Sequence, residues 1–132
     1  MYLLDTNTCI EYLRRRNVRV KEQIELRRPR EIRLCSIVVA ELFHGAYRSA
    51  EPKKNLALVD EIVGTFLSLP FDDVAAEMFG DLRTKLERTG NPIGPYDLQI
   101  ASIASVHSLT LVTHNVGEFA RVSNLKIEDW QA

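Results

Sequence analysis

The sequence predicts an α/β fold in which a central, mostly parallel sheet is covered by helices on both faces. Short apolar runs alternate along the chain with longer segments of helical periodicity, which is typical of parallel sheets. The 132 residues correspond to one compact unit, so we expect a single domain over residues 1–132. Hydrophobic residues make up 45% and charged residues 27%, a balance that indicates a folded globular chain rather than a disordered one.

The first half of the chain is expected to contain two strands and four helices. Thr8 and Glu11 have the spacing of a capping box, a hydroxyl followed three residues later by a carboxylate, which predicts the start of a helix. Pro29 closes a second helix, and Ser36 can cap the helix after the second strand. The expected strands are 2–4 and 32–35, and the expected helices are 8–15, 18–27, 36–49 and 52–67.

The second half of the chain is expected to contain three strands and two long helices. Residues 68–70 could form an edge strand, since proline is tolerated there. Apolar residues recur at a spacing of three to four over 74–88, so one face of this helix should be buried, and part of it could form a dimer surface. Pro95 opens the next helix at its first turn. The last expected strands are 109–113 and 126–128.

Several classes of protein are excluded by composition. The longest apolar runs, such as residues 37–40, are far shorter than the roughly 20 residues of a membrane span, so we expect no contact with a membrane. The first residues carry no export signal, which predicts a cytoplasmic protein. Cys9 and Cys35 lack metal or redox spacing and are expected to be reduced core thiols.

Positive charge is concentrated in one segment. Residues 14–33 hold nine bases and three acids and carry a charge of +6. Because the whole chain has a net charge of −1, the rest of it carries −7. Such a basic segment suits a phosphate backbone that approaches one edge of the protein. A solvated helix face that binds an acidic partner would have the same composition, and both interpretations stay open.

Three acids occupy positions that a parallel sheet would bring to one rim. Asp5 directly follows the first strand, Glu41 lies in an apolar stretch of the helix after the second strand, and Asp97 lies in the first turn of the helix opened by Pro95. Asp5 could merely cap a turn and Asp97 could merely complement the helix dipole. If the acids converge, oxygen ligands alone would suit Mg²⁺ or Mn²⁺, which can activate a water against a phosphodiester.

A set of motifs, in a fixed order over nearly the whole chain, carries a family resemblance. These are Leu4-Asp5-Thr6-Asn7-Thr8, Ala40-Glu41-Leu42 with Gly45-Ala46, Gly94-Pro95-Tyr96-Asp97 with Ile100-Ala101, Leu111-Val112-Thr113, Asn115, Glu118-Phe119 and Ile127-Glu128-Asp129-Trp130. In these motifs the chain resembles the PIN-domain nucleases, and more closely the VapC-type toxins of type II toxin–antitoxin systems.

The resemblance implies a three-layer α/β/α PIN-like fold and a Mg²⁺- or Mn²⁺-dependent endoribonuclease with Asp5, Glu41 and Asp97 as catalytic, metal-site acids. It also implies an RNA substrate, with tRNA and in particular the anticodon loop of initiator tRNA expected. A cognate VapB-type antitoxin is implied as the partner that neutralises the toxin, and a homodimer as the assembly.

A fourth acid, which the family often places after the fourth strand, is missing at its first expected position, where His114 and Asn115 follow Thr113. We favour Asn115 as the site residue through its amide oxygen, with Glu118 as the alternative one turn further. Asn115 and Glu118 could instead form a helix-capping pair.

Other side chains are candidates for supporting roles. Asn7 could hydrogen-bond a metal ligand, and Ser36 and Thr113 lie at strand ends that face the same rim. Arg83 could reach a phosphate, although a solvated side chain is the simpler interpretation, and Trp130 is expected to serve in packing.

Two other functions remain possible from the sequence. Asp5-Thr6-Asn7-Thr8 is one amide away from the DxDxT motif of haloacid-dehalogenase phosphatases, in which Asp5 would be a nucleophile, but Asn7 lacks the required acid. A catalytically degenerate domain that binds RNA or protein is the second alternative, supported by the missing fourth acid.

Overall fold

The computed structural model describes residues 1–132 and contains five strands, seven α-helices and one short 3₁₀ helix. The elements, in chain order, are β1 (Tyr2–Leu4), α1 (Thr6–Arg14), α2 (Val18–Glu25), the 3₁₀ helix η1 (Pro29–Glu31), β2 (Ile32–Cys35), α3 (Ser36–Tyr47), α4 (Pro52–Thr65), β3 (Leu67–Leu69), α5 (Asp73–Arg88), α6 (Pro95–Val106), β4 (Thr110–Val112), α7 (Val116–Phe119) and β5 (Ile127–Glu128).

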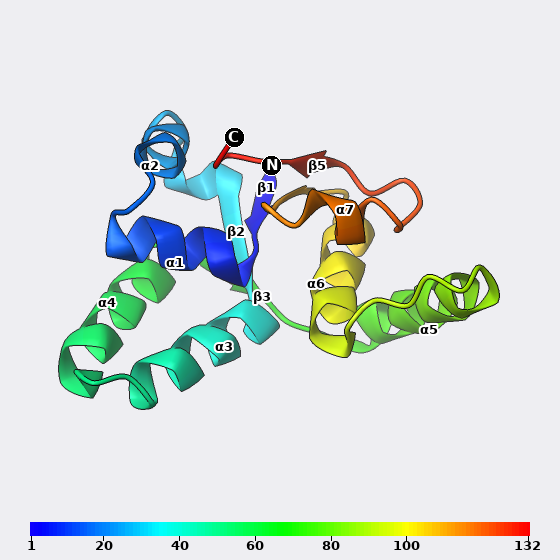
Figure 1. Ribbon diagram of the computed structural model, residues 1–132, viewed down its shortest axis with the longest axis horizontal. Coiled ribbons are helices and arrows are strands. Elements are labelled where there is room, and N and C mark those ends of the chain that lie inside the picture. Colours follow the sequence, from blue (N-terminus) through cyan, green and yellow to red (C-terminus); the bar gives the residue numbers. More distant parts are fainter.

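The five strands form one sheet in the order β3-β2-β1-β4-β5, and every neighbouring pair is parallel. Parallel strands require crossover connections, which are almost always right-handed. The chain moves from β1 outward to β3 and then returns to β4 on the other side of β1, so the crossovers change face. In Figure 1, α1 to α4 lie on one side of the sheet and α5 to α7 on the other. The predicted α/β/α architecture is confirmed.

The change of direction between β1 and β4 is what positions a site. Open α/β sheets form their crevice beyond the carboxyl ends of the strands, where the strand order reverses. Here that point lies between Leu4, the last residue of β1, and Val112, the last residue of β4, which are paired in the sheet. The Asp5 N–H donates to the Val112 carbonyl at 3.0 Å and extends the pairing to the start of α1.

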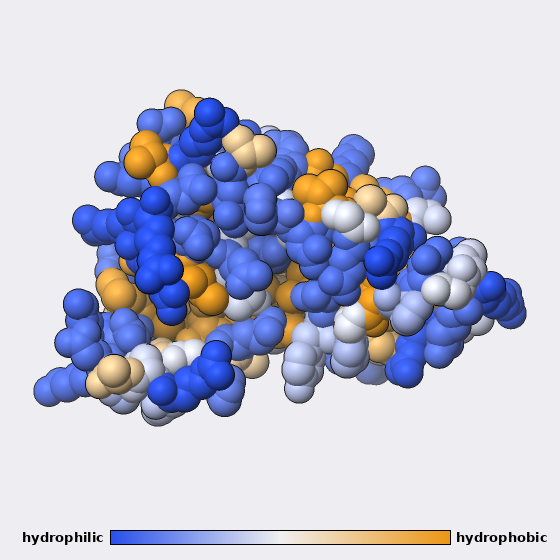
Figure 2. Space-filling model, viewed as in Figure 1, coloured by the Kyte–Doolittle hydropathy of each residue, from blue (hydrophilic) through white to orange (hydrophobic).

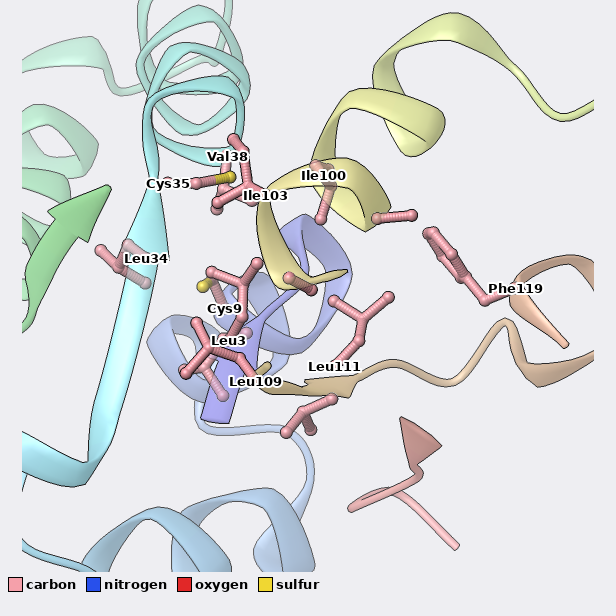
Figure 3. Packing of buried hydrophobic residues seen from close by; sticks show 14 of the residues in the cluster. Leu3, Cys9, Leu34, Cys35, Val38, Ile100, Ile103, Leu109, Leu111 and Phe119 are labelled. Carbon is pink, nitrogen blue, oxygen red and sulfur yellow. The ribbon is translucent and has the colours of Figure 1, made fainter. Parts of the chain in front are cut away.

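The core lies between the sheet and both helix layers. Leu3, Leu34 and Leu111 from three adjacent strands are fully buried, and Val38 of α3 and Ile103 of α6 cover them (Figure 3). Buried apolar residues at successive positions of a strand are typical of a sheet that is covered on both faces. Burying one such leucine stabilises the fold by about 1.5–3 kcal/mol.

The two cysteines are part of this core. Cys9 of α1 and Cys35 at the end of β2 are buried free thiols (Figure 3), as the sequence predicted. Burial raises the pKa of the Cys35 thiol to about 11, and it also raises the pKa of Cys9. Neither thiol is therefore a nucleophile at neutral pH.

Two predicted helix caps are wrong by one or more residues. The cap of α1 is Asp5, whose carboxylate accepts a hydrogen bond from the Thr8 N–H at 2.8 Å, so the helix begins at Thr6 rather than Thr8. An aspartate caps as well as a hydroxyl does, and Asp5 comes first after the strand. The cap of α3 is Cys35; Ser36 is already helical, and its hydroxyl donates to the Leu69 carbonyl at 3.5 Å.

The other predicted elements are present with small shifts, whereas η1 and α7 were not among the predicted elements. The helix predicted to reach residue 67 ends at Thr65, and β3 starts at Leu67 as an edge strand, with Pro70 just after it. In α5, Leu82 and Leu86 are buried, and the helix packs against α6, so the apolar stripe serves the chain's own core. No helix combines the length and apolar character that a membrane crossing requires.

The arginine at position 27 joins the two ends of the chain. Its guanidinium lies 4.4 Å from the ring centroids of both Tyr2 and Trp130, whose own rings are 5.1 Å apart. The same group donates to the Gln23 carbonyl at 2.8 Å and to the Tyr2 hydroxyl at 3.3 Å. Trp130 is buried, as its predicted packing role requires.

Replacing Arg27 with alanine should therefore lower the free energy of unfolding by about 1–2 kcal/mol, because two cation–π contacts and three hydrogen bonds, including one to the Gln23 side-chain oxygen, are lost. Urea denaturation followed by Trp130 fluorescence measures this change. Arg28→Ala is the matched control, since Arg28 is the exposed neighbour and its loss should have no measurable effect. Equal stability of the two variants would contradict the role of Arg27.

Candidate active site

Asp5 stands at the centre of the rim formed by the carboxyl ends of β1 and β4. It is only 6% exposed, and its carboxylate caps α1. Burial raises the pKa of Asp5, while hydrogen bonds from Thr113 and Thr8 lower it and the neighbouring Glu41 raises it. The Thr8 hydroxyl donates to the Val112 carbonyl at 3.2 Å, which ties α1 to the end of β4. An ionisable group is thus held rigidly in a place that disfavours its charge.

Glu41 approaches Asp5 from α3. Its side chain is half-buried, and its Oε1 accepts a hydrogen bond from the Thr6 hydroxyl at 2.7 Å. A carboxylate among apolar neighbours requires such a partner. Sequence reasoning did not identify Thr6; its only signal was its position directly after Asp5.

Asp97 reaches the rim from the other helix layer, at the start of α6. Burial, together with the like charges of Glu118, Glu41 and Asp5 in that order, raises its pKa to about 6. Electrostatic effects of this kind require neighbours within several ångströms. Asp5, Glu41 and Asp97, the three acids predicted from the sequence, are therefore close enough to act on one another electrostatically, and Glu118 joins them.

The start of α7 places Glu118 and Asn115 differently from the capping pair that was considered. Glu118 Oε2 accepts from the Asn115 amide at 2.7 Å, and Oε1 accepts from the Gly94 N–H at 3.3 Å. Asn115 stands at the helix cap position, but its side chain makes no capping hydrogen bond. Glu118 instead links α7 to the start of α6, and Asn115 orients its carboxylate.

The other predicted supporting residues divide into two groups. Thr113 is fully buried, hydrogen-bonds Asp5, and accepts from the Asn115 N–H at 3.0 Å, so it belongs to the rim. Asn7 is exposed on α1 next to Thr6. Ser36 is bonded to β3, on the side of β2 away from β1, and is not brought to the acids.

Two further side chains considered from the sequence have other contacts. Arg83 is exposed and pairs with Glu87 on the same helix at 3.8 Å. His114 Nδ1 lies 3.0 Å from an oxygen of Asp129, which connects the β4–α7 loop to the C-terminal segment.

The rim acids offer only carboxylate oxygens, which are the kind of ligand that hard divalent cations take. These oxygens belong to four acids, and no Lys or Arg forms an ion pair with any of them. As the side chains stand, no three acidic, histidine or cysteine side chains form a group that could hold an ion. The raised pKa of Asp97 has burial as its first cause and the like charges of the other three acids as its second.

One hollow in the surface lies away from the rim. A pocket of about 210 Å³ is formed by α1, α2 and α4 and includes Leu13, Arg15 and Ile62 in its lining. Figure 2 shows strongly hydrophilic side chains beside apolar ones on this part of the surface. None of the four rim acids lines this pocket, so it is not part of the candidate active site.

Comparisons with known proteins agree with this geometry. The PIN domain family matches residues 2–125. The chain is 39% identical over 129 residues to a tRNA(fMet)-specific endonuclease VapC of Salmonella typhimurium and 37% identical to that of Shigella flexneri, covering 98% of this chain and 97% of each relative.

Solved structures show the same likeness. A DNA-bound VapBC of Salmonella typhimurium superposes with a TM-score of 0.92 at 39% identity, covering 98% of this chain and 97% of the other. A DNA-bound VapBC2 of Rickettsia felis gives 0.89 at 34% identity, covering 98% of both chains. The chain belongs to the VapC family of PIN-domain proteins.

The pKa of Asp97 predicts a pH dependence of stability. A pKa raised in the folded state favours the protonated acid there, so the stabilisation is complete below pH 3.8 and is lost as the pH rises through about 6. With a chelator present, the free energy of unfolding should therefore fall between pH 4 and pH 7, and Asp97→Asn should reduce that slope.

Asp60→Asn, an exposed change on α4, is the control and should retain the full slope. Some slope should remain in Asp97→Asn, because the raised pKa of Asp5 acts in the same direction. Urea denaturation at several pH values measures it. An unchanged slope in Asp97→Asn would show that the acid is not strained.

Proposed function

We propose that this protein is an endoribonuclease toxin that cleaves tRNA in the cytoplasm, with initiator tRNA as the substrate, and that a VapB-type antitoxin neutralises it. The observation that carries the proposal is the convergence of Asp5, Glu41, Asp97 and Glu118 at the rim of the sheet. Support comes from relatives named tRNA(fMet)-specific endonuclease and from neighbours solved as VapBC complexes.

We further propose that these acids hold Mg²⁺ or Mn²⁺. When bound, such an ion supplies an activated water and stabilises the charge of the scissile phosphate. Asp5 and Asp97 are the acids whose charge the fold most disfavours, so they gain most from a cation. Thr6 orients Glu41, and Asn115 orients Glu118, so that both carboxylates face a fixed direction.

Positive charge for the RNA backbone is supplied by the arginines at the end of α1. Arg14, Arg15 and Arg16 are exposed there, on the helix whose first turn is capped by Asp5. An RNA chain whose scissile phosphate lies at the rim can therefore continue along α1 toward these arginines. The acidic rim and the basic segment lie at opposite ends of one helix of 9 residues.

The two alternative functions lose their support. The haloacid-dehalogenase phosphatase requires Asp5 as a nucleophile, but Asp5 is the cap of α1 and Asn7 is exposed beside it. The PIN match over residues 2–125 covers the whole proposed site. A degenerate binding domain rested on the missing fourth acid, and Glu118 supplies a carboxylate beside Asp97.

Cleavage of tRNA(fMet) should require divalent metal and Asp5. Asp5→Asn should reduce the rate at least about 100-fold, since a buried metal ligand is lost, and EDTA should abolish cleavage until Mg²⁺ or Mn²⁺ is restored. Sequencing of the RNA ends measures both the rate and the position of the cut. Asp60→Asn is the matched control. Cleavage that continues in EDTA would refute the metal mechanism.

Removing the three charges of Arg14, Arg15 and Arg16 should weaken binding of tRNA(fMet) and flatten its dependence on salt. Each lost phosphate contact lowers the slope of log affinity against log salt by about 0.7–0.9. The affinity for tRNA(fMet) is measured at several salt concentrations with proteins that carry Asp5→Asn, so that the RNA is not cleaved. An unchanged slope would mean that these arginines are only solvated.

We also propose a homodimer, as expected from the family resemblance. Val74 is exposed at the start of α5, and Met78 and Phe79 of the same helix are only half-buried, so apolar surface remains beside the packed stripe.

A further inference from the structure

An exposed aromatic ring stands beside the acidic rim. Tyr96 directly precedes Asp97 in the first turn of α6 and is 62% exposed. The other exposed aromatic side chain, Tyr47, is the last residue of α3 and lies six residues beyond Glu41. Six helical residues correspond to about 9 Å, so Tyr47 lies well away from the rim. Tyr96 is thus the exposed aromatic that adjoins the proposed catalytic acids.

The backbone that carries Tyr96 is held rigidly. Pro95 fixes the first helical position, and the Gly94 N–H donates to Glu118 at 3.3 Å. Leu98 and Ile100, just beyond, are buried in the core. The position of the ring relative to Asp97 is therefore set by a fixed helix turn, and only the side-chain torsions of Tyr96 remain free.

Within the chain, the Tyr96 ring has no aromatic partner. The aromatic and cation–π contacts involve Tyr2, Phe71, Phe79 and Trp130, and the hydroxyl of Tyr96 takes part in no side-chain hydrogen bond. An aromatic ring that is mostly exposed contributes little to folding, but it offers a flat face to a ligand. Tyr96 and Asp97 belong to the same first turn of α6, and their side chains leave the helix on neighbouring faces about 100° apart, so a nucleotide chain at Asp97 passes within one residue of the ring.

We propose that Tyr96 stacks on an unpaired base of the RNA next to the scissile phosphate, an inference that rests on the proposed function. Proteins read RNA mainly through unstacked bases of loops and ends, which aromatic side chains receive. Stacking tolerates every base because each has a π-face, so Tyr96 selects for unpaired RNA rather than for a sequence. The ring then positions the phosphate that follows or precedes that base over the acids.

The test compares Tyr96→Phe, Tyr96→Ala and the remote control Tyr47→Ala. KM and kcat are measured on tRNA(fMet), and affinity for the same tRNA is measured in an Asp5→Asn background. Tyr96→Ala should weaken the affinity about 5- to 150-fold and should raise KM by a similar factor, as the loss of one stacked base requires. Tyr96→Phe keeps the ring and should stay within about twofold of the parent, as should Tyr47→Ala.

A second measurement keeps the test independent of folding. Thermal melting should show the same midpoint for all three variants, because the Tyr96 side chain is exposed and unpartnered. A tRNA(fMet) anticodon stem-loop with 2-aminopurine in the loop should be quenched on binding by the parent and by Tyr96→Phe, and less by Tyr96→Ala.

Three results would overturn the inference. These are a parental KM in Tyr96→Ala, an equal loss in Tyr96→Phe, which would assign the effect to the hydroxyl, and a loss of antitoxin binding with tRNA binding unchanged. Its failure is distinct from failure of the proposed function. Cleavage by Asp5→Asn would refute the nuclease site itself, whereas an inactive Asp5→Asn with a normal Tyr96→Ala would refute only the stacking.

Discussion

Repulsion among carboxylates at one rim of the parallel sheet is the constraint on which the site depends. Each acid is delivered by a different element: the end of β1, the second turn of α3, the first turn of α6 and the short helix α7. Burial and like charge together raise the pKa of Asp97 to about 6. A fold that holds such groups together stores an unfavourable energy, and a divalent cation or a proton relieves it.

The sheet topology explains why the acids meet. The reversal of strand order places the carboxyl ends of β1 and β4 side by side, where helices of both layers begin. Hydrogen bonds from Asp5 and Thr8 to Val112 tie α1 to β4, and the hydrogen bond from Gly94 to Glu118 ties the start of α6 to α7. Rigid elements rather than long loops hold every acid, as a metal site requires.

Much of this arrangement was predictable from the sequence. Alternation of short apolar runs with helical periodicity predicted all five strands and the parallel sheet, and the order of elements predicted that Asp5, Glu41 and Asp97 would share a rim. The capping of α1 was not predicted correctly, because Asp5 and Thr8 are both good caps and only the end of β1 decides between them.

Side-chain partnerships were the part that the sequence could not supply. The bond from Thr6 to Glu41 spans 35 residues, and no local spacing signals it. The choice between Asn115 and Glu118 depended on where α7 turns toward Gly94, 24 residues away from Glu118. Ser36 shows the opposite case, a strand-end residue that the fold directs toward β3.

We propose that the rim carboxylates bind a divalent cation, and anomalous diffraction from crystals soaked in Mn²⁺ would locate such an ion. We expect a peak between Asp5 and Asp97, within ligand distance of at least one further rim carboxylate, and no peak there in Asp97→Asn crystals. A peak at another place on the protein, or none at a saturating Mn²⁺ concentration, would show that the rim is not a metal site.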